Sequence, residues 1–337
     1  MRFAYTLGAA TVALLAVSAT ADADEVVLKY ATLNPPGSAV TREWNLPWVE
    51  KINQAGKGAL KIEVFPGEAL ANNLNVYDRV LADVAQMAWG IPIYFTGKFK
   101  LTNVPGLPFL GGNAEAQSTA FWRLYAKGAF GDEYSEIRPL VMIGLPQSGI
   151  HMASKPMRTL DDFKGTKFRT GSKIAGDIIL ALGGTPISIQ VGEMTQALQR
   201  GLVEGVIMPW TAFNPFRLDE VTHYHVDVPF GGGPIFIFMA KKRYDALPAA
   251  AKTAIDDNSG EAASRDFGKW WDGEDKKTRD RVSNLPGHTV VTLPKDEYDR
   301  WAARVQTVLD EWGKSIPGGG EVIAQYKQEI ANVQAGH

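Results

Sequence analysis

Apolar and polar positions follow one another in the first part of the chain in blocks that predict strands and helices in turn. Apolar and polar side chains alternate over residues 26–30, and Pro35, Pro36 and Gly37 then stop the run, as at a strand that ends in a turn. Two further apolar runs predict strands, and the amphipathic segments after the first two runs predict helices. These strands are expected at residues 60–67 and 86–94, and the helices at residues 41–54 and 72–84. Such alternation predicts βαβ units and a mainly parallel sheet.

The same alternation restarts after Pro139. Strands are expected at residues 140–145, 149–154, 166–170, 185–189 and 203–210, with helices at residues 172–182 and 191–201. The tail from Ala249 to Gln334 is mostly helical in pattern and includes one long candidate helix over residues 249–283. We therefore predict an α/β protein of two lobes, each a mainly parallel sheet flanked by helices, with a long lobe-spanning helix and a helical C-terminal tail. Ligands usually bind at such a domain interface.

Residues 1–23 have the features of a secretory signal peptide. Arg2 gives a positive start, residues 11–17 are apolar, and small Ala-x-Ala sites end the segment. The alternative is a membrane anchor, but the segment is short and rich in alanine, threonine and glycine for a membrane-spanning helix. We therefore predict an exported protein of a bacterial periplasm, whose mature chain starts near Asp22 or Asp24.

Composition and charge exclude several classes of partner and site. The net charge is −2, and no run of lysine and arginine indicates nucleic acid or an anionic membrane surface as the partner. The chain has no cysteine, which excludes disulfides, thiolate zinc sites, a catalytic thiol and a lipoprotein anchor. The hydrophobic fraction of 45% and the charged fraction of 21% are those of an ordinary soluble globular protein.

Motifs for catalysis and cofactor binding are absent or incomplete. Residues 171–176 have the glycine spacing of a P-loop, but Asp177 and Ile178 stand where Lys and Ser or Thr are needed. His223 and His225 face the same side of a strand, as a pair of metal ligands does, yet no third ligand is near, so a solvated or core pair is favoured. We therefore predict no enzyme activity, no cofactor and no metal site.

Arg169 is the strongest candidate for ligand recognition. Residues 167–170 alternate like a strand, Gly171 and Ser172 predict a turn and a helix N-cap, and residues 183–184 predict the end of that helix. The arginine then lies where a strand gives way to a helix N-terminus, which favours anions through free N–H groups and the helix dipole. A guanidinium can hold a carboxylate through two parallel hydrogen bonds. A surface or interdomain salt bridge explains the arginine equally well.

Trp89 and Trp210 are weaker candidates. Each lies late in an apolar strand, where open α/β sheets place their ligands. Core packing is the favoured alternative for both side chains when their position in the pattern is the only guide.

Residues 167–210, from "KFRTGSKIAGDIILALGGTPISIQ" to "VGEMTQALQRGLVEGVIMPW", resemble the central block of TRAP-transporter solute-binding proteins, the dicarboxylate-binding-protein-like extracytoplasmic receptors. Segments elsewhere agree in order and spacing, so the resemblance covers nearly the whole mature chain. They are "ATLNPPGS", "VFPGEAL", "MAWGIPIYFTGKFKLTNVPGLPFL", "KPMRTLDDFKG" and "AKKRYDALP".

The resemblance implies a periplasmic binding protein fold that closes on an organic acid and delivers it to a membrane permease driven by an ion gradient. Arg169 occupies the position of the family arginine that binds the ligand carboxylate. Lobe I is then expected at residues 24–148 plus 235–274, and lobe II at residues 149–234 plus 275–337. The polar C-terminus shows no dimerisation element, so we expect a monomer.

The chain also departs from the family pattern at two positions. His151 stands where many members carry a second ligand arginine, and Met208 stands where many carry an asparagine. One strong carboxylate clamp with an otherwise apolar wall is expected, because a thioether and aromatic rings suit a hydrophobic ligand body. The candidate ligand-binding residues are Arg169, Trp89, Trp210, Met208, His151, Phe213, Phe236, Pro36 and Gly90.

The hypothesis is a TRAP receptor for an aromatic or branched monocarboxylate, such as a 2-oxo or 2-hydroxy acid. Sugar acids are disfavoured because they need more polar partners. A dicarboxylate stays open if His151 is protonated or Lys173 reaches the ligand. A sensor that feeds a signalling protein uses the same binding module, and a periplasmic enzyme on this architecture is the least favoured alternative.

Overall fold

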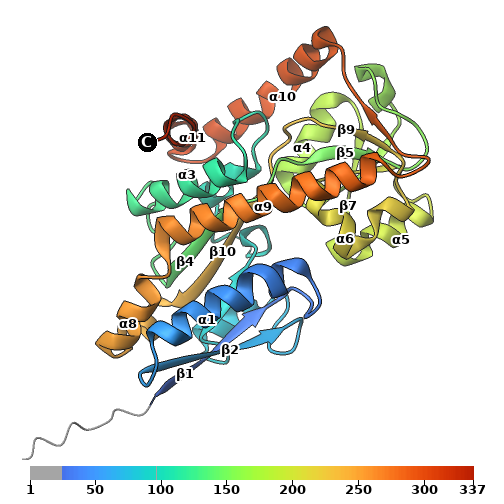
Figure 1. Cartoon of the computed structure of the whole chain (residues 1–337). Coiled ribbons are helices and arrows are strands. Elements are labelled where there is room, and N and C mark those ends of the chain that lie inside the picture. The colour runs from blue at the N-terminus through green and yellow to red at the C-terminus, as the bar shows by residue number, and fades with distance from the viewer. Residues whose placement is uncertain (1–24, 96) are drawn as a thin grey trace, which may run out of the picture.

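Two β-sheets organise the protein, and the computed structural model describes residues 25–95 and 97–337 (Figure 1). The first sheet has the strand order β2-β1-β3-β10-β4, and the second has the order β11-β9-β5-β8-β6-β7. The first is built from β1 (Val26–Thr32), β2 (Leu60–Pro66), β3 (Met87–Gly90), β4 (Ile137–Gly144) and β10 (Pro234–Ala240). The second is built from β5 (Gly149–Met152), β6 (Lys167–Thr170), β7 (Thr185–Ser188), β8 (Gly205–Met208), β9 (Tyr224–Val226) and β11 (Thr289–Val291). The predicted two-sheet α/β fold with flanking helices is confirmed.

Both sheets are mainly parallel, as predicted, and each contains one antiparallel strand. β1 runs parallel to β2 and β3, but β10 is antiparallel to both β3 and β4. In the second sheet β5 is antiparallel to both of its neighbours, β8 and β9. The reason is the path of the chain. It leaves the first sheet after β4, enters the second as β5, and returns from β9 to β10, so the outgoing and returning strands run in opposite directions.

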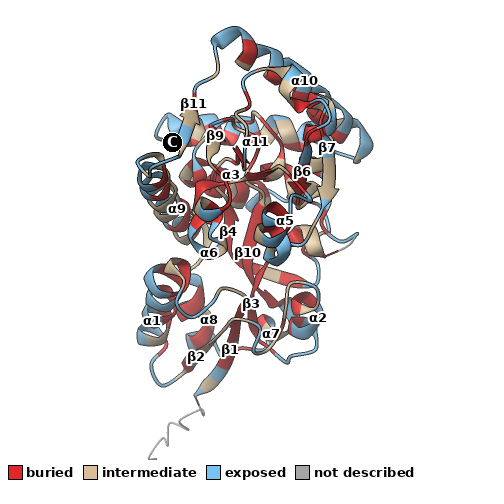
Figure 2. Ribbon diagram, turned by 90° about the vertical axis from the view of Figure 1, so that its right-hand side faces the viewer, coloured by how far each residue is buried: buried red, intermediate tan, exposed pale blue. Residues whose placement is uncertain are grey.

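Helices cover the faces of both sheets and bury their apolar sides, while their polar sides are exposed (Figure 2). They are α1 (Leu46–Ala55), α2 (Val76–Leu81), α3 (Ala114–Ala126), α4 (Lys173–Leu182), α5 (Met194–Gln199), α6 (Phe213–Phe216), α7 (Lys241–Asp245), α8 (Ala249–Asp256), α9 (Gly260–Ser283), α10 (Lys295–Ser315) and α11 (Gly319–Gln334). The single long helix expected over residues 249–283 is wrong, because the chain breaks it into α8 and α9. Gly260 has φ of 82° there, outside the right-handed helical region.

The α9 helix runs past both sheets, as expected of a lobe-spanning helix (Figure 1). Two carboxylates one helical turn apart fix it to both sides. Asp272 accepts hydrogen bonds from the backbone N–H groups of Ala114 and Glu115 at the start of α3 (2.7 and 2.9 Å). Asp275 accepts one from the N–H of Thr211, beside the second sheet, at 3.1 Å. Free N–H groups at helix starts favour such anionic partners.

The helical C-terminal tail is confirmed, and its two long helices rest on different parts of the fold. α10 packs on α4, beside the second sheet. α11 packs on α3, where the Tyr326 hydroxyl donates to the carbonyl of Gln117 at 3.1 Å. The lobe boundaries given above stay a prediction.

The predicted signal peptide lies outside the described residues. Within the part of the chain that the structure describes, no helix combines the length and the apolar character needed to cross a membrane.

Candidate ligand-binding site

The carboxyl ends of parallel strands from the two sheets meet at Arg169 and Tyr94. Arg169 lies next to the last residue of β6, and Tyr94 lies four residues after β3 in a short 3₁₀ turn, Pro92–Tyr94. Tyr94 raises the pKa of Arg169, which puts its hydroxyl within interaction range of the guanidinium. Ligands of open α/β sheets bind outside the carboxyl ends of strands, so this pair marks the candidate site.

The local structure around Arg169 is the one that the sequence predicts. Residues Lys167–Thr170 form β6, and Ser172 caps α4 by accepting a hydrogen bond from the N–H of Ala175 at 3.1 Å. Gly183 ends the helix in a left-handed conformation with φ of 96°. The arginine therefore projects where a strand ends and a helix begins.

Two contacts from the second sheet fix the plane of the guanidinium. Its Nε donates to the carbonyl of Ile189 at 2.9 Å, and its Nη1 lies 3.4 Å from the Sδ of Met208. Gly171 allows this placement, because a Cβ there would lie 2.9 Å from Nη2 and 3.0 Å from Nη1. With Nε already used, the edge formed by Nη1 and Nη2 is the one suited to a carboxylate.

The positive charge of Arg169 has no acidic partner among the described residues, in which no ion pair includes it. The side chain is only 3% exposed. Burial lowers the pKa of Arg169 below its usual value, and Tyr94 partly opposes that shift. A buried charge without a counter-charge is costly, so the site is built for an anion supplied from outside.

Apolar side chains stand at or just beyond the carboxyl ends of strands in both sheets. All are partly buried, so each keeps some surface free. They are Leu33 after β1, Ile91 after β3, Ile187 and Ile189 in and after β7, and Met208 at the end of β8. They suit a ligand body that is apolar rather than rich in hydroxyls.

Three candidates from the sequence lie in the core of the first sheet. Trp89 is 3% exposed and packs against Phe267 on α9, with ring centroids 5.7 Å apart. Phe236 is fully buried in a cluster with Phe99, at 5.3 Å. Gly90 is buried against the rings of Phe236 and its neighbours. This burial favours the packing interpretation. Pro36, in contrast, is exposed in the turn after β1.

The remaining aromatic candidates surround His151 rather than Arg169. The rings of Trp210 and Phe213 both lie 4.7 Å from the His151 ring. Trp210 also donates from Nε1 to Asp227 at 2.8 Å, so its polar atom is already used. His151 is fully buried, and its Nε2 lies 3.0 Å from the carbonyl of Met208. His151 therefore contacts Met208, and Met208 in turn contacts Arg169.

Lys173, the other cation considered from the sequence, is turned to solvent. Its side chain is 87% exposed and pairs with Asp177 at 2.6 Å, one turn along α4. Neither Lys173 nor His151 therefore offers a free positive charge beside Arg169.

Sequence reasoning missed Tyr94 and the partners of His151. Tyr94 was included in a strand, but Pro92 lacks an N–H donor and the chain turns after Gly90. The signal available was a tyrosine just beyond a strand's carboxyl end. His225 and His288, which continue from His151, come from segments far apart in the sequence, and no local pattern joins them.

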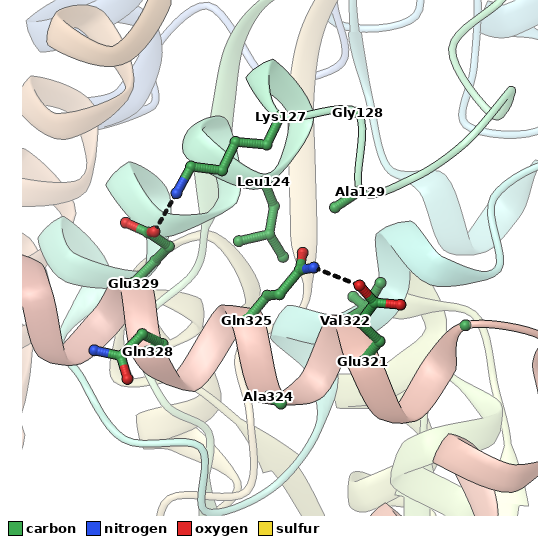
Figure 3. A pocket seen from close by; sticks show the side chains of 11 residues that line it. Leu124, Lys127, Gly128, Ala129, Glu321, Val322, Ala324, Gln325, Gln328 and Glu329 are labelled. Atoms are coloured by element: carbon green, nitrogen blue, oxygen red, sulfur yellow. Dashed lines mark hydrogen bonds and ion pairs between the residues drawn. The ribbon is translucent and has the colours of Figure 1, made fainter.

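A separate hollow of about 650 Å³ lies between α3 and α11 (Figure 3). It is lined by residues such as Leu124, Gln325 and Val322, and Lys127 pairs with Glu329 across it at 2.5 Å. Its lining includes none of the residues around Arg169, so it is not the candidate site.

Known proteins resemble this chain in both sequence and fold. The family model for bacterial extracellular solute-binding proteins, family 7 (DctP), matches residues 30–315. The C4-dicarboxylate-binding periplasmic protein DctP of Rhodobacter capsulatus is 25% identical over 336 residues, which is 96% of each chain.

Solved structures of TRAP solute-binding proteins share the fold. One from a marine metagenome, specific for aromatic acid ligands and solved with 3-hydroxybenzoate, has a TM-score of 0.85 and 26% identity, and the match covers 92% of this chain and 99% of that one. Another from Rhodoferax ferrireducens, solved with copurified benzoate, has a TM-score of 0.83 and 26% identity, covering 91% and 98%.

Proposed function

This chain belongs to bacterial extracellular solute-binding protein family 7, and we propose that it is the periplasmic receptor of a TRAP transporter for an aromatic or branched monocarboxylate. The observation that carries the proposal is Arg169, a buried guanidinium that has no acidic partner among the described residues. The receptor passes its ligand to membrane permease subunits, and its signal peptide directs it to the periplasm.

The proposed binding mode follows from the geometry of the guanidinium. The ligand carboxylate takes the edge formed by Nη1 and Nη2, and the apolar body lies among the partly exposed side chains at the strand ends. Tyr94 comes from the first sheet and Arg169 from the second, so a carboxylate between them contacts both lobes. Ligand then favours closure by contacts that only the closed form provides.

The ligand class is supported by two relatives that hold aromatic acids, 3-hydroxybenzoate and benzoate. A dicarboxylate, suggested by the name of the Rhodobacter capsulatus relative, would need a second cation, and Lys173 is already paired outside the site. The family and these structural neighbours are binding proteins, which supports a receptor rather than an enzyme.

A thermal-shift panel on the purified mature protein tests the proposal. The panel contains benzoate, 3-hydroxybenzoate, mandelate, branched 2-oxo acids, succinate and galacturonate. A ligand at a hundred times its Kd adds about 2.7 kcal/mol to the free energy of unfolding. We expect shifts from the apolar monocarboxylates only. Shifts from succinate or galacturonate alone would contradict the ligand class, and no shift from any acid would contradict the receptor assignment, once bound ligand has been removed by partial unfolding and refolding.

Tyr94→Phe is expected to weaken binding of the best acid in the panel by about three- to tenfold, because one hydrogen bond to the carboxylate is lost. Tyr298→Phe on α10, whose ring packs against Phe109 with centroids 5.5 Å apart, is the matched control and should leave the Kd unchanged. Titration calorimetry measures both. Equal Kd values for wild type and Tyr94→Phe would remove Tyr94 from the site.

A further inference from the structure

Three histidines form a continuous chain of hydrogen bonds behind the candidate site. The Nδ1 atoms of His151 and His225 are 3.1 Å apart, and Nε2 of His225 is 3.0 Å from Nδ1 of His288. At the inner end, Nε2 of His151 is 3.0 Å from the carbonyl of Met208. The chain thus connects partly exposed His288, just before β11, to the residue that touches Arg169.

Strand register puts this chain on the same face of the sheet as Arg169. His225 pairs with His151, His151 pairs with Val206, and Val206 pairs with Arg169 on its other side. Paired residues in neighbouring strands project to the same face. The side chains of His225, His151 and Arg169 therefore project from the same face of the second sheet.

The direction of every hydrogen bond in the chain is fixed by its inner end. A carbonyl only accepts, so Nε2 of His151 carries the proton and Nδ1 of a neutral His151 accepts. His225 must then donate from Nδ1 and accept at Nε2, and His288 must donate from Nδ1. His151 is an Nε2–H tautomer, and His225 and His288 are Nδ1–H tautomers.

Burial keeps the two inner rings neutral. It lowers the pKa of His151 to about 4, and that of His225 to about 2 with help from the neighbouring histidines. Around the chain, Asp227 favours the charged form of His151. Asp219 favours the charged form of His288, while His223 and Arg281 oppose it. Arg279 on α9 pairs with Asp227 at 2.7 Å and offsets its charge.

We propose that His151 is a positioning residue of the ligand site, held in one tautomer by His225 and His288, and that it fixes Met208 against Arg169. The inference rests on the proposed function, because Arg169, which Met208 contacts, is the residue proposed to bind the ligand carboxylate. Its Nε2–H holds the Met208 carbonyl, and the Met208 thioether lies against Nη1 of the guanidinium. A proton added to His151 would require His225 to reverse its tautomer, so the inner chain responds to pH as a unit.

The pH dependence has a defined sign. An unfolded histidine has a pKa of about 6.5, so between about pH 6.5 and pH 4 the unfolded state binds more protons than the folded state at His151. Stability contributed by neutral His151 is therefore present above about pH 6.5 and is lost as pH falls towards 4. If only the neutral form of His151 supports binding, half of the receptor is competent at about pH 4, and the apparent affinity there is half of its value at neutral pH.

Two variants separate positioning from packing. His151→Gln keeps an N–H donor near the position of Nε2, whereas His151→Leu keeps volume and loses the donor. We expect His151→Leu to bind benzoate about tenfold more weakly at neutral pH and His151→Gln to stay within about threefold of wild type. The affinity of wild type relative to His151→Gln should fall about twofold near pH 4. His337→Gln, at an exposed histidine after α11, is the control and should change neither.

Nitrogen-15 NMR of the histidine side chains tests the chain without any ligand. The expected result is an Nε2–H tautomer at His151 and Nδ1–H tautomers at His225 and His288, with the His151 resonances shifting on addition of benzoate. Other tautomers at His151 or His225, or equal losses in His151→Leu and His151→Gln, would overturn the proposal. If no acid binds wild type, the proposed function fails, and with it the positioning role, whereas the tautomers still report whether the chain exists.

Discussion

Arg169→Met is expected to abolish binding of carboxylates and at the same time to stabilise the ligand-free protein. Arg169 is 3% exposed and has no acidic partner in the part of the chain that the structure describes, so the empty receptor carries the desolvation penalty of an uncompensated charge. Methionine keeps much of the volume and removes the charge, which should raise the free energy of unfolding by about 1–3 kcal/mol. Losing two charge-assisted hydrogen bonds should weaken binding by about a hundredfold or more.

Thermal denaturation with and without benzoate measures both halves of this result. Lys173→Met is the matched control, because Lys173 lies four residues away but its side chain is 87% exposed and paired with Asp177. That variant should bind within about twofold of wild type, since surface pairs contribute little. An Arg169→Met protein that is less stable than wild type when empty, or that still binds benzoate, would contradict the assignment of Arg169 as an unpaired clamp.

Gly268→Ala is expected to destabilise the protein by about 1–3 kcal/mol, although alanine is the better helix former. Gly268 lies inside α9, and a Cβ there would be 2.3 Å from the carbonyl oxygen of Ala114 and 2.7 Å from Cα of Glu115. These are backbone atoms at the start of α3, so no side-chain rotation relieves the clash. Moving α9 away from α3 to relieve the clash would also lengthen the two hydrogen bonds that Asp272 accepts from the N–H groups of Ala114 and Glu115.

Gly273→Ala in the same helix is the control, because nothing lies within 4 Å of the Cβ it would add. There the gain in helix propensity should stabilise the protein by up to about 1 kcal/mol. Urea denaturation of the two variants gives the comparison. Equal stabilities for Gly268→Ala and Gly273→Ala would show that α9 and α3 are not packed as closely as described.

Local chemistry explains which parts of the structure were predictable from the sequence. The strand, turn and cap around Arg169 follow from neighbouring residues, since Ser172 and Gly183 each act within one helical turn. The antiparallel returns of β5 and β10 were not predictable in this way, because they depend on how the chain passes between sheets. The break before α9 is decided by one glycine at positive φ inside a helical pattern.

The candidate site also contains some residues that the local sequence indicates and others that depend on contacts between distant segments. Arg169 could be proposed from its strand-to-helix position, which is a property of adjacent residues. Met208 was proposed only from the family resemblance, at a position where many members carry an asparagine. Tyr94 and the chain through His151 depend on contacts between segments separated by tens of residues. The aromatic residues Trp210 and Phe213 were assigned to a ligand wall, whereas in the fold they pack around His151, which sequence periodicity could not distinguish.

The central claim is that a single buried guanidinium holds the ligand by its carboxylate. The most direct test is titration calorimetry of the wild-type receptor with the tightest-binding acid of the panel and with the primary amide of that acid. The two molecules have the same apolar body and differ in charge at one group. We predict that the amide binds about a hundredfold more weakly than the acid, because it cannot neutralise Arg169. Similar Kd values for acid and amide would contradict the account.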